Sequence, residues 1–243
     1  MKKLFMLVLV VLFVFSALNA DYLVKQETKT GAVMGKQAKT LIQDLWIGDG
    51  VYANVQDKQV TIVNSKKKVM YIVYNDKKSY VEMKLPVDIK KYLPSAGASM
   101  VETMLNSMTA KVTPNGKTGK VGNWKTKGYN VVMTTTMAMG MSVTVNMDIE
   151  ASTDVTFDWK KLSTEYMGAM MMSTGSMSSK VINEMKKIKG YTVKMDTSAK
   201  IMGMNMKTSM RVLEITKKDA PKGIYTVPAG YKKMEKLVSK QKK

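Results

Sequence analysis

The side chains with the most distinctive chemistry in this chain are methionine thioethers. Of 25 methionines, 23 follow Ala20, where the only phenylalanine is Phe157. Thioethers select Cu(I), and methionines that alternate along a strand point the same way, as ligands must. Copper binding is one of three interpretations. The others are an ordinary core filled by an adaptable residue, and a flexible cavity lining for acyl chains. The densest groups are Met139/Met141, Met170/Met171/Met172 and Met202/Met204/Met206.

Histidine and cysteine are both absent from the chain. Their absence excludes Ser-His-Asp catalysis, a cysteine nucleophile, disulfides, and imidazole or thiolate metal sites. No Ser-Lys motif stands out. We therefore expect a binding or structural protein and not an enzyme, with no cofactor and, in the leading interpretation, no metal.

Four carboxylates lie close together in the sequence and could in principle serve glycosidase-type chemistry. They are Asp148, Glu150, Asp154 and Asp158. Asp148 and Glu150 fall on the polar side of an alternating segment, which favours a solvated surface over a catalytic pair.

The first 20 residues have the three-part pattern of a secretory signal: a basic start, an apolar run and small residues up to Ala20. We expect cleavage after Ala20, a single domain over 21–231 and a Lys-rich tail over 232–243. The apolar run is too short for a comfortable membrane span, and no cysteine follows it that could carry lipid. The predicted location is the periplasm or the exterior.

The chain is strongly basic, with a formal net charge of +20. Arg211 is its only arginine. Proteins that bind nucleic acids favour arginine, because its forked guanidinium group binds phosphates and base edges with two hydrogen bonds. We therefore expect no nucleic-acid partner. The lysines indicate either a solvated surface or a weak preference for anionic membrane headgroups, and the protein is expected to be a monomer.

Most of the chain after the signal is predicted to be β-strand. Short β-type runs at near-constant spacing are separated by polar turns, which is typical of antiparallel hairpins. The 116–128 region is expected to hold turns. The predicted strands are 21–30, 39–48, 51–55, 60–63, 69–74 and 79–85, followed by long hairpins over 131–149 and 193–214 that turn near Gly140 and Gly203.

Two segments interrupt the strands with helical spacing. After Pro94, Met100, Met104 and Met108 fall on one stripe, and 159–188 is compatible with helix. A sheet with one apolar face must cover that face. The predicted fold class is therefore α+β: a curved antiparallel sheet, or half-barrel, covered by two helical segments.

One face of the long strands is apolar and rich in methionine, while the other is mostly polar. We expect the apolar face to be concave and the Met100 stripe to cover it. The predicted ligand-binding residues are Met100, Met104, Met108, Met133, Met137, Met139, Met141, Val143, Met147, Met204, Met206 and Met210.

Three stretches resemble an uncharacterised secreted bacterial family, domain of unknown function 4412. They are 60–85, the 116–131 stretch with Gly122, Trp124, Lys127 and Tyr129, and the Ala-Pro-x-Gly-x-Tyr-x-Val-Pro-x-Gly-Tyr run within 219–231. The order of elements is also similar to the LolA/LolB-like lipoprotein-localisation superfamily. That resemblance implies a half-barrel closed by helices, and several of its members carry acyl chains across the periplasm. Members of the first family often have a cysteine in the stretch matching 124–129, which is absent here.

The sequence thus favours a non-enzymatic periplasmic or secreted protein with a hydrophobic, Met-rich cavity that binds lipid or lipoprotein acyl chains. Two alternatives remain open at this point: a structural envelope protein with no cavity ligand, and a periplasmic Cu(I)-binding protein.

Overall fold

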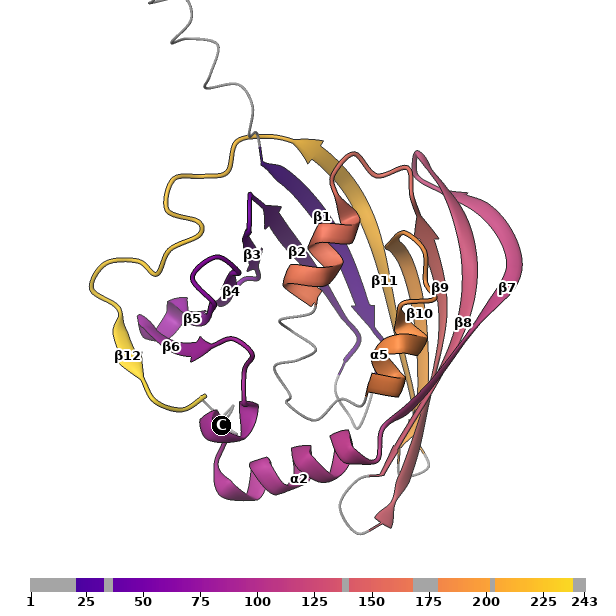
Figure 1. The fold of residues 1–243 in the computed structure, drawn as a ribbon, viewed down its shortest axis with the longest axis horizontal. Helices are drawn as coiled ribbons and strands as arrows, with labels where there is room; N and C mark the ends of the chain where they lie inside the picture. The colour runs from indigo at the N-terminus through magenta and orange to yellow at the C-terminus, as the bar shows by residue number, and fades with distance from the viewer. Residues whose placement is uncertain (1–20, 33–36, 137–139, 168–178, 202–203, 238–243) are drawn as a thin grey trace, which may run out of the picture.

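The computed structural model describes residues 21–32, 37–136, 140–167, 179–201 and 204–237. Their twelve strands form a single curved sheet in the order β12-β6-β5-β4-β3-β2-β1-β11-β10-β9-β8-β7 (Figure 1). All neighbouring strands are antiparallel except β12 and β6. The strands are β1 Tyr22–Thr30, β2 Lys39–Ile47, β3 Val51–Val55, β4 Gln59–Asn64, β5 Val69–Tyr74, β6 Ser79–Lys84, β7 Thr109–Val121, β8 Trp124–Thr136, β9 Ser142–Ser152, β10 Tyr191–Ile201, β11 Met204–Lys217 and β12 Lys232–Met234. The predicted curved antiparallel sheet is confirmed.

Short hairpins build the half of the sheet from β2 to β6, because the polar turns between them end each strand. β5 has the predicted bounds, and β4 is extended by one residue at each end. Lys68 and Lys78 have positive φ values of 53° and 44°, the conformation that closes such tight turns. Alternation then directs Tyr52, Val63 and Val81 into the largest core cluster.

The other half consists of longer strands, and here one prediction is right only at the hairpin tip, where Gly122 and Asn123 form a turn. The 116–128 region, expected to hold turns, belongs almost entirely to β7 and β8, which pair up to the partners Val121 and Trp124. A register shift between Pro114 and Thr118 absorbs the irregular residues without ending the strand. The glycines therefore mark a bulge and a tip, not the end of the β structure.

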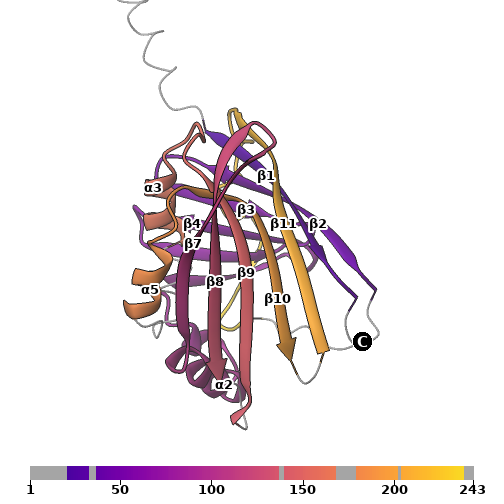
Figure 2. The ribbon, with the colours of Figure 1, turned by 90° about the vertical axis from the view of Figure 1, so that its right-hand side faces the viewer.

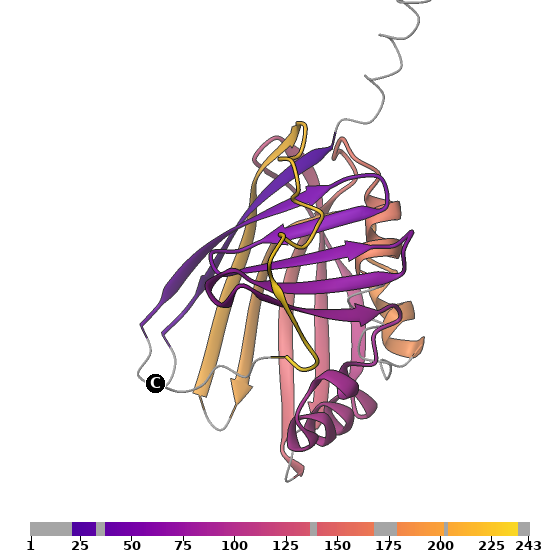
Figure 3. The ribbon, with the colours of Figure 1, turned by 90° about the vertical axis from the view of Figure 1, so that its left-hand side faces the viewer.

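The described helical segments are short. They are η1 Asn75–Lys77, η2 Ile89–Tyr92, α2 Ser95–Asn106, α3 Trp159–Leu162, the π-helical turn η4 Ser163–Met167 and α5 Ser179–Met185. Within the helix-compatible 159–188 stretch, the structure describes α3 with η4 before residue 168 and α5 after residue 178. These two lie over the concave face, whereas α2 lies across one end of the half-barrel (Figures 1 and 3).

The C-terminal segment crosses the opposite face of the sheet, over β3 to β6 (Figure 3). Ile224, Tyr225 and Val227 pack there against a cluster that contains Trp46 and Ile62. The sheet therefore buries apolar residues on both faces in its N-terminal half. Lys232–Met234, which the sequence assigned to the tail, form β12 beside β6.

Candidate functional site

Methionines from four neighbouring strands share the concave face. Met133 on β8, Met147 on β9 and Met195 on β10 pack around the buried side chains of Tyr129 and Val131. On β11, Met210 packs against the largest core cluster, and Met204 and Met206 follow the same alternation. Met195 and Met210 are direct cross-strand partners. Strand pairing thus joins methionines from distant segments into one surface.

These methionines are half-buried, in contrast to their aliphatic neighbours. Val131 is 1% exposed and Val143 is 5% exposed, whereas Met133, Met147, Met204, Met206 and Met210 all have intermediate exposure. From the helical side, Met185 of α5 and the nearby Ile188 join the same cluster. Part of each methionine therefore remains accessible beside buried aliphatic side chains.

The predicted helical cover of this face is wrong in one respect. Met100 is 43% exposed and does not cover the sheet. The α2 helix instead lies against η2 and the end of β8. The contact is polar: the Thr135 hydroxyl donates to the Met104 carbonyl at 2.5 Å, and the Thr136 amide donates to the Ser107 hydroxyl at 2.8 Å. Leu105 of that helix is buried, in contrast to Met100. Met104 and Met108 are half-buried.

Several predicted site residues lie at the turn between β8 and β9. Met141 is 38% exposed there, so it lies at the surface and not within the cluster. Met137 and Met139 fall outside the described residues, as do Met202 and the Met170–Met172 group. In the part of the chain that the structure describes, no group of three or more acidic side chains is placed to hold a metal ion.

A groove of about 690 Å³ lies on the other face of the same strands. Its walls are mainly polar side chains from β8 to β11 and from the β1–β2 hairpin. Asp148 and Asp196 are direct cross-strand partners within it, and Lys29, Lys39 and Lys207 line its other side. The expected ligand groove lay on the concave face, so this hollow on the other face is a different feature.

The clustered carboxylates have structural partners. Glu150 accepts hydrogen bonds from the Thr126 hydroxyl at 2.8 Å and from Lys194 at 3.0 Å. Partial burial raises the pKa of Glu150, but these two bonds and the positive charges of Lys194 and Arg211 together hold the pKa below its usual range. Asp154 accepts from the Lys125 amide, and Asp158 caps α3 by accepting from the Lys161 amide. This arrangement is that of surface and capping residues.

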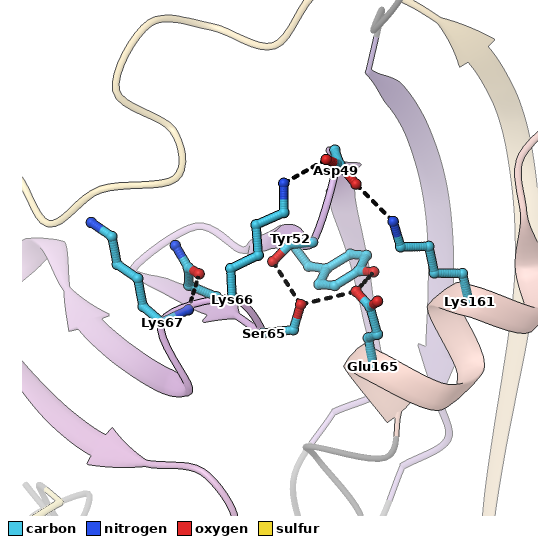
Figure 4. A network of polar contacts seen from close by, with 9 residues as sticks. Asp49, Tyr52, Ser65, Lys66, Lys67, Lys161 and Glu165 are labelled. Atoms are coloured by element: carbon cyan, nitrogen blue, oxygen red, sulfur yellow. Dashed lines mark hydrogen bonds and ion pairs between the residues drawn. The ribbon is translucent and has the colours of Figure 1, made fainter.

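Sequence reasoning missed a polar junction where α3 and η4 meet the sheet (Figure 4). Glu165 of η4 accepts hydrogen bonds from the Tyr52 hydroxyl at 2.7 Å and the Ser65 hydroxyl at 2.9 Å. The Asp49 carboxylate lies between two ammonium groups. Its oxygens are 2.5 Å from Lys66 Nζ and 2.7 Å from Lys161 Nζ. The contacts of Glu165 and the Asp49–Lys161 pair join residues 100 or more positions apart in the chain, and no local motif signals them.

Electrostatics at the junction follow from these contacts. Hydrogen bonds from Lys161 and Lys66 lower the pKa of Asp49 to about 2. Burial, together with the Glu165 carboxylate, raises the pKa of Tyr52 well above its usual value. Tyr52 is therefore a neutral donor, and the junction anchors the helical segment over the concave face.

Comparisons with known proteins find solved structures of distant similarity but no family. No family model matches the chain, and no curated protein matches it. Among solved structures, PNGF-II is 11% identical with a TM-score of 0.42, covering 90% of this chain and 31% of that one. A LolA superfamily protein from Nitrosomonas europaea is 8% identical with a TM-score of 0.33, covering 85% and 90%. A DUF1329 family protein from Desulfovibrio piger is 8% identical with a TM-score of 0.34, covering 91% and 95%.

The chain thus spans about a third of the length of PNGF-II. Because no family model matches, membership of domain of unknown function 4412 stays a prediction. At these levels of identity, a fold can host many ligands. What the site can do follows from its own residues: an accessible thioether surface on one face, and carboxylates held by structural partners on the other.

Proposed function

We propose that this is a non-enzymatic periplasmic or secreted protein that binds a hydrophobic ligand, of the acyl-chain type, on the methionine face. The methionine face is defined here by Met133, Met147, Met195, Met206 and Met210. The observation that carries the proposal is their shared intermediate exposure above buried Val131 and Tyr129.

Methionine suits this role because its unbranched, polarisable side chain adapts to many apolar shapes. A core that only stabilises the fold would gain most by burying such side chains fully. Here they stay partly accessible, next to α5, whose Met185 completes the cluster. Binding an acyl chain would remove this surface from water without any polar group to desolvate.

The proposed location rests on the sequence pattern of residues 1–20. Those residues lie outside the described part of the chain. Among the helices that the structure describes, none is long and apolar enough to cross a bilayer. The competing proposal, a structural envelope protein, differs in requiring no ligand on the methionine face.

The test is binding of a fluorescent fatty acid, together with native mass spectrometry of the purified protein for co-purified lipid. The test variant is M133Q/M147Q/M206Q. The matched control is V132Q/N146Q/N205Q, because these neighbours on the same strands point to the other face. We expect the first variant to lose most of the binding and the control to retain it.

Two results would contradict the proposal. One is the absence of both co-purified lipid and fatty-acid binding in the unaltered protein, which would favour the structural role. The other is an equal loss of binding in the two variants. Thermal unfolding of each variant separates loss of binding from loss of fold.

A further inference from the structure

The β7–β8 hairpin carries a concentration of unneutralised charge. Between Thr109 and Met147 the sequence contains five lysines and no acidic residue. Four of the lysines belong to the distal part of the hairpin, and all four are exposed: Lys117, Lys120, Lys125 and Lys127. Lysines elsewhere, such as Lys66, Lys161 and Lys233, form ion pairs. Among the described residues, these four form none.

Strand pairing concentrates three of these charges on one surface. Lys120 and Lys125 are direct cross-strand partners, and Lys127 lies on the same side as Lys125 because it is two residues further along the strand. Like charges directly opposite each other destabilise a sheet. Their clustering therefore works against folding, and an anionic partner would relieve it.

The surrounding acids do not neutralise the cluster. Glu150 is occupied by Lys194 and Thr126. Asp154 accepts a hydrogen bond from the Lys125 main-chain amide, not from its ammonium group. The hairpin also forms one side of the sheet, with β7 as the edge strand (Figures 1 and 2). A large flat partner can approach it there without crossing another element.

We propose that the distal β7–β8 hairpin is a docking surface for membranes that contain anionic phospholipid. Lysine ammonium groups bind headgroup phosphates as point charges. The surface contains no arginine, whose guanidinium group is the usual donor for recognising nucleic-acid bases. This inference does not depend on the proposed ligand of the methionine face.

The test is co-sedimentation with vesicles of phosphatidylcholine alone and of phosphatidylcholine with phosphatidylglycerol. Each lysine close to an anionic surface strengthens binding about five-fold. We therefore expect K120Q/K125Q/K127Q to weaken binding to the anionic vesicles by about 100-fold. The control K58Q/K77Q/K222Q removes the same charge from exposed positions without an ion pair in the described chain. It should lose far less binding.

Three outcomes would overturn the inference. These are equal binding to both vesicle types, equal losses in the two triple variants, and tighter binding to a duplex DNA oligonucleotide than to anionic vesicles. Thermal unfolding shows whether each variant folds. Fatty-acid binding measured without vesicles should be the same in all three proteins, so failure of membrane docking is distinguishable from failure of the proposed ligand binding.

Discussion

The Glu184 carboxylate accepts a hydrogen bond of 2.8 Å from the backbone amide of Val112. Val112 lies on β7, the edge strand of the sheet, and Glu184 lies on α5. The carboxylate therefore satisfies a main-chain donor that would otherwise face a neighbouring molecule. Exposed strand edges are sites of intermolecular pairing, so this contact protects the edge.

We expect Glu184→Ala to increase self-association by freeing that amide. Sedimentation velocity over a range of concentrations measures the effect. Glu235→Ala, at an exposed position without a described contact, controls for the loss of one acidic charge. An unchanged, concentration-independent sedimentation coefficient in Glu184→Ala would show that the edge is protected by other means.

Asp49 should make the stability of the protein depend on pH. Its pKa is lowered from 3.8 to about 2 in the folded state. A lowered carboxyl pKa stabilises the fold above the unfolded value, and this stabilisation is lost as the pH falls through the folded value. We expect Asp49→Asn to reduce the free energy of unfolding at neutral pH, with the deficit shrinking between pH 4 and 2, about the interval between the two pKa values.

Urea unfolding at several pH values tests this expectation. Asp57→Asn is the matched control, since Asp57 is exposed in the β3–β4 turn and has no described partner. A deficit of constant size from neutral to acidic pH would mean that Asp49 acts through something other than its charge.

Removing the Tyr52 hydroxyl should weaken the attachment of η4 to the sheet. Tyr52→Phe deletes the 2.7 Å bond to Glu165 but leaves the bond from Ser65. Because one donor remains, we expect a loss of about 1–2 kcal/mol in the free energy of unfolding. Tyr80→Phe, whose hydroxyl has no described hydrogen bond, should change it little. Equal effects of the two substitutions would contradict the assignment of Glu165 as the anchor.

Asp148 and Asp196 face each other across β9 and β10 in the polar groove. Like charges at directly opposite positions cost stability. We expect Asp148→Asn to stabilise the fold by roughly 0.2–1 kcal/mol at neutral pH, measured by urea unfolding in low salt. Asp219→Asn, exposed and outside the sheet, should be neutral. A destabilised Asp148→Asn would indicate that the carboxylate has a favourable partner in solution.

Local features of the sequence predicted the strands well. The β5 strand has the same first and last residues as predicted, because its alternating residues are flanked by polar turns on both sides. Alternation also separated the two faces of β8 and β9 correctly, since Val131 and Ile149 are buried and Asn130 and Asp148 are exposed. Such predictions depend only on residues that are close together in the chain.

Long-range relationships could not be predicted in this way. The stripe at Met100 shows that one side of α2 is apolar, but it cannot show which element lies opposite, and Met100 is exposed. The Asp49–Lys161 and Tyr52–Glu165 contacts join segments more than a hundred residues apart. Nothing in the local sequence distinguishes these charges from the solvated ones around them.

The position of β1 has a consequence for the order of assembly. β1 lies in the middle of the sheet, between β2 and β11, and its partner β11 is nearly the last strand of the chain. A chain that emerges from its N-terminus first must therefore keep one side of β1 unpaired until almost all of its residues are available. Completion of the fold is thus tied to the arrival of the far end, and any pause before residue 204 would leave a growing chain with an open β edge at its centre.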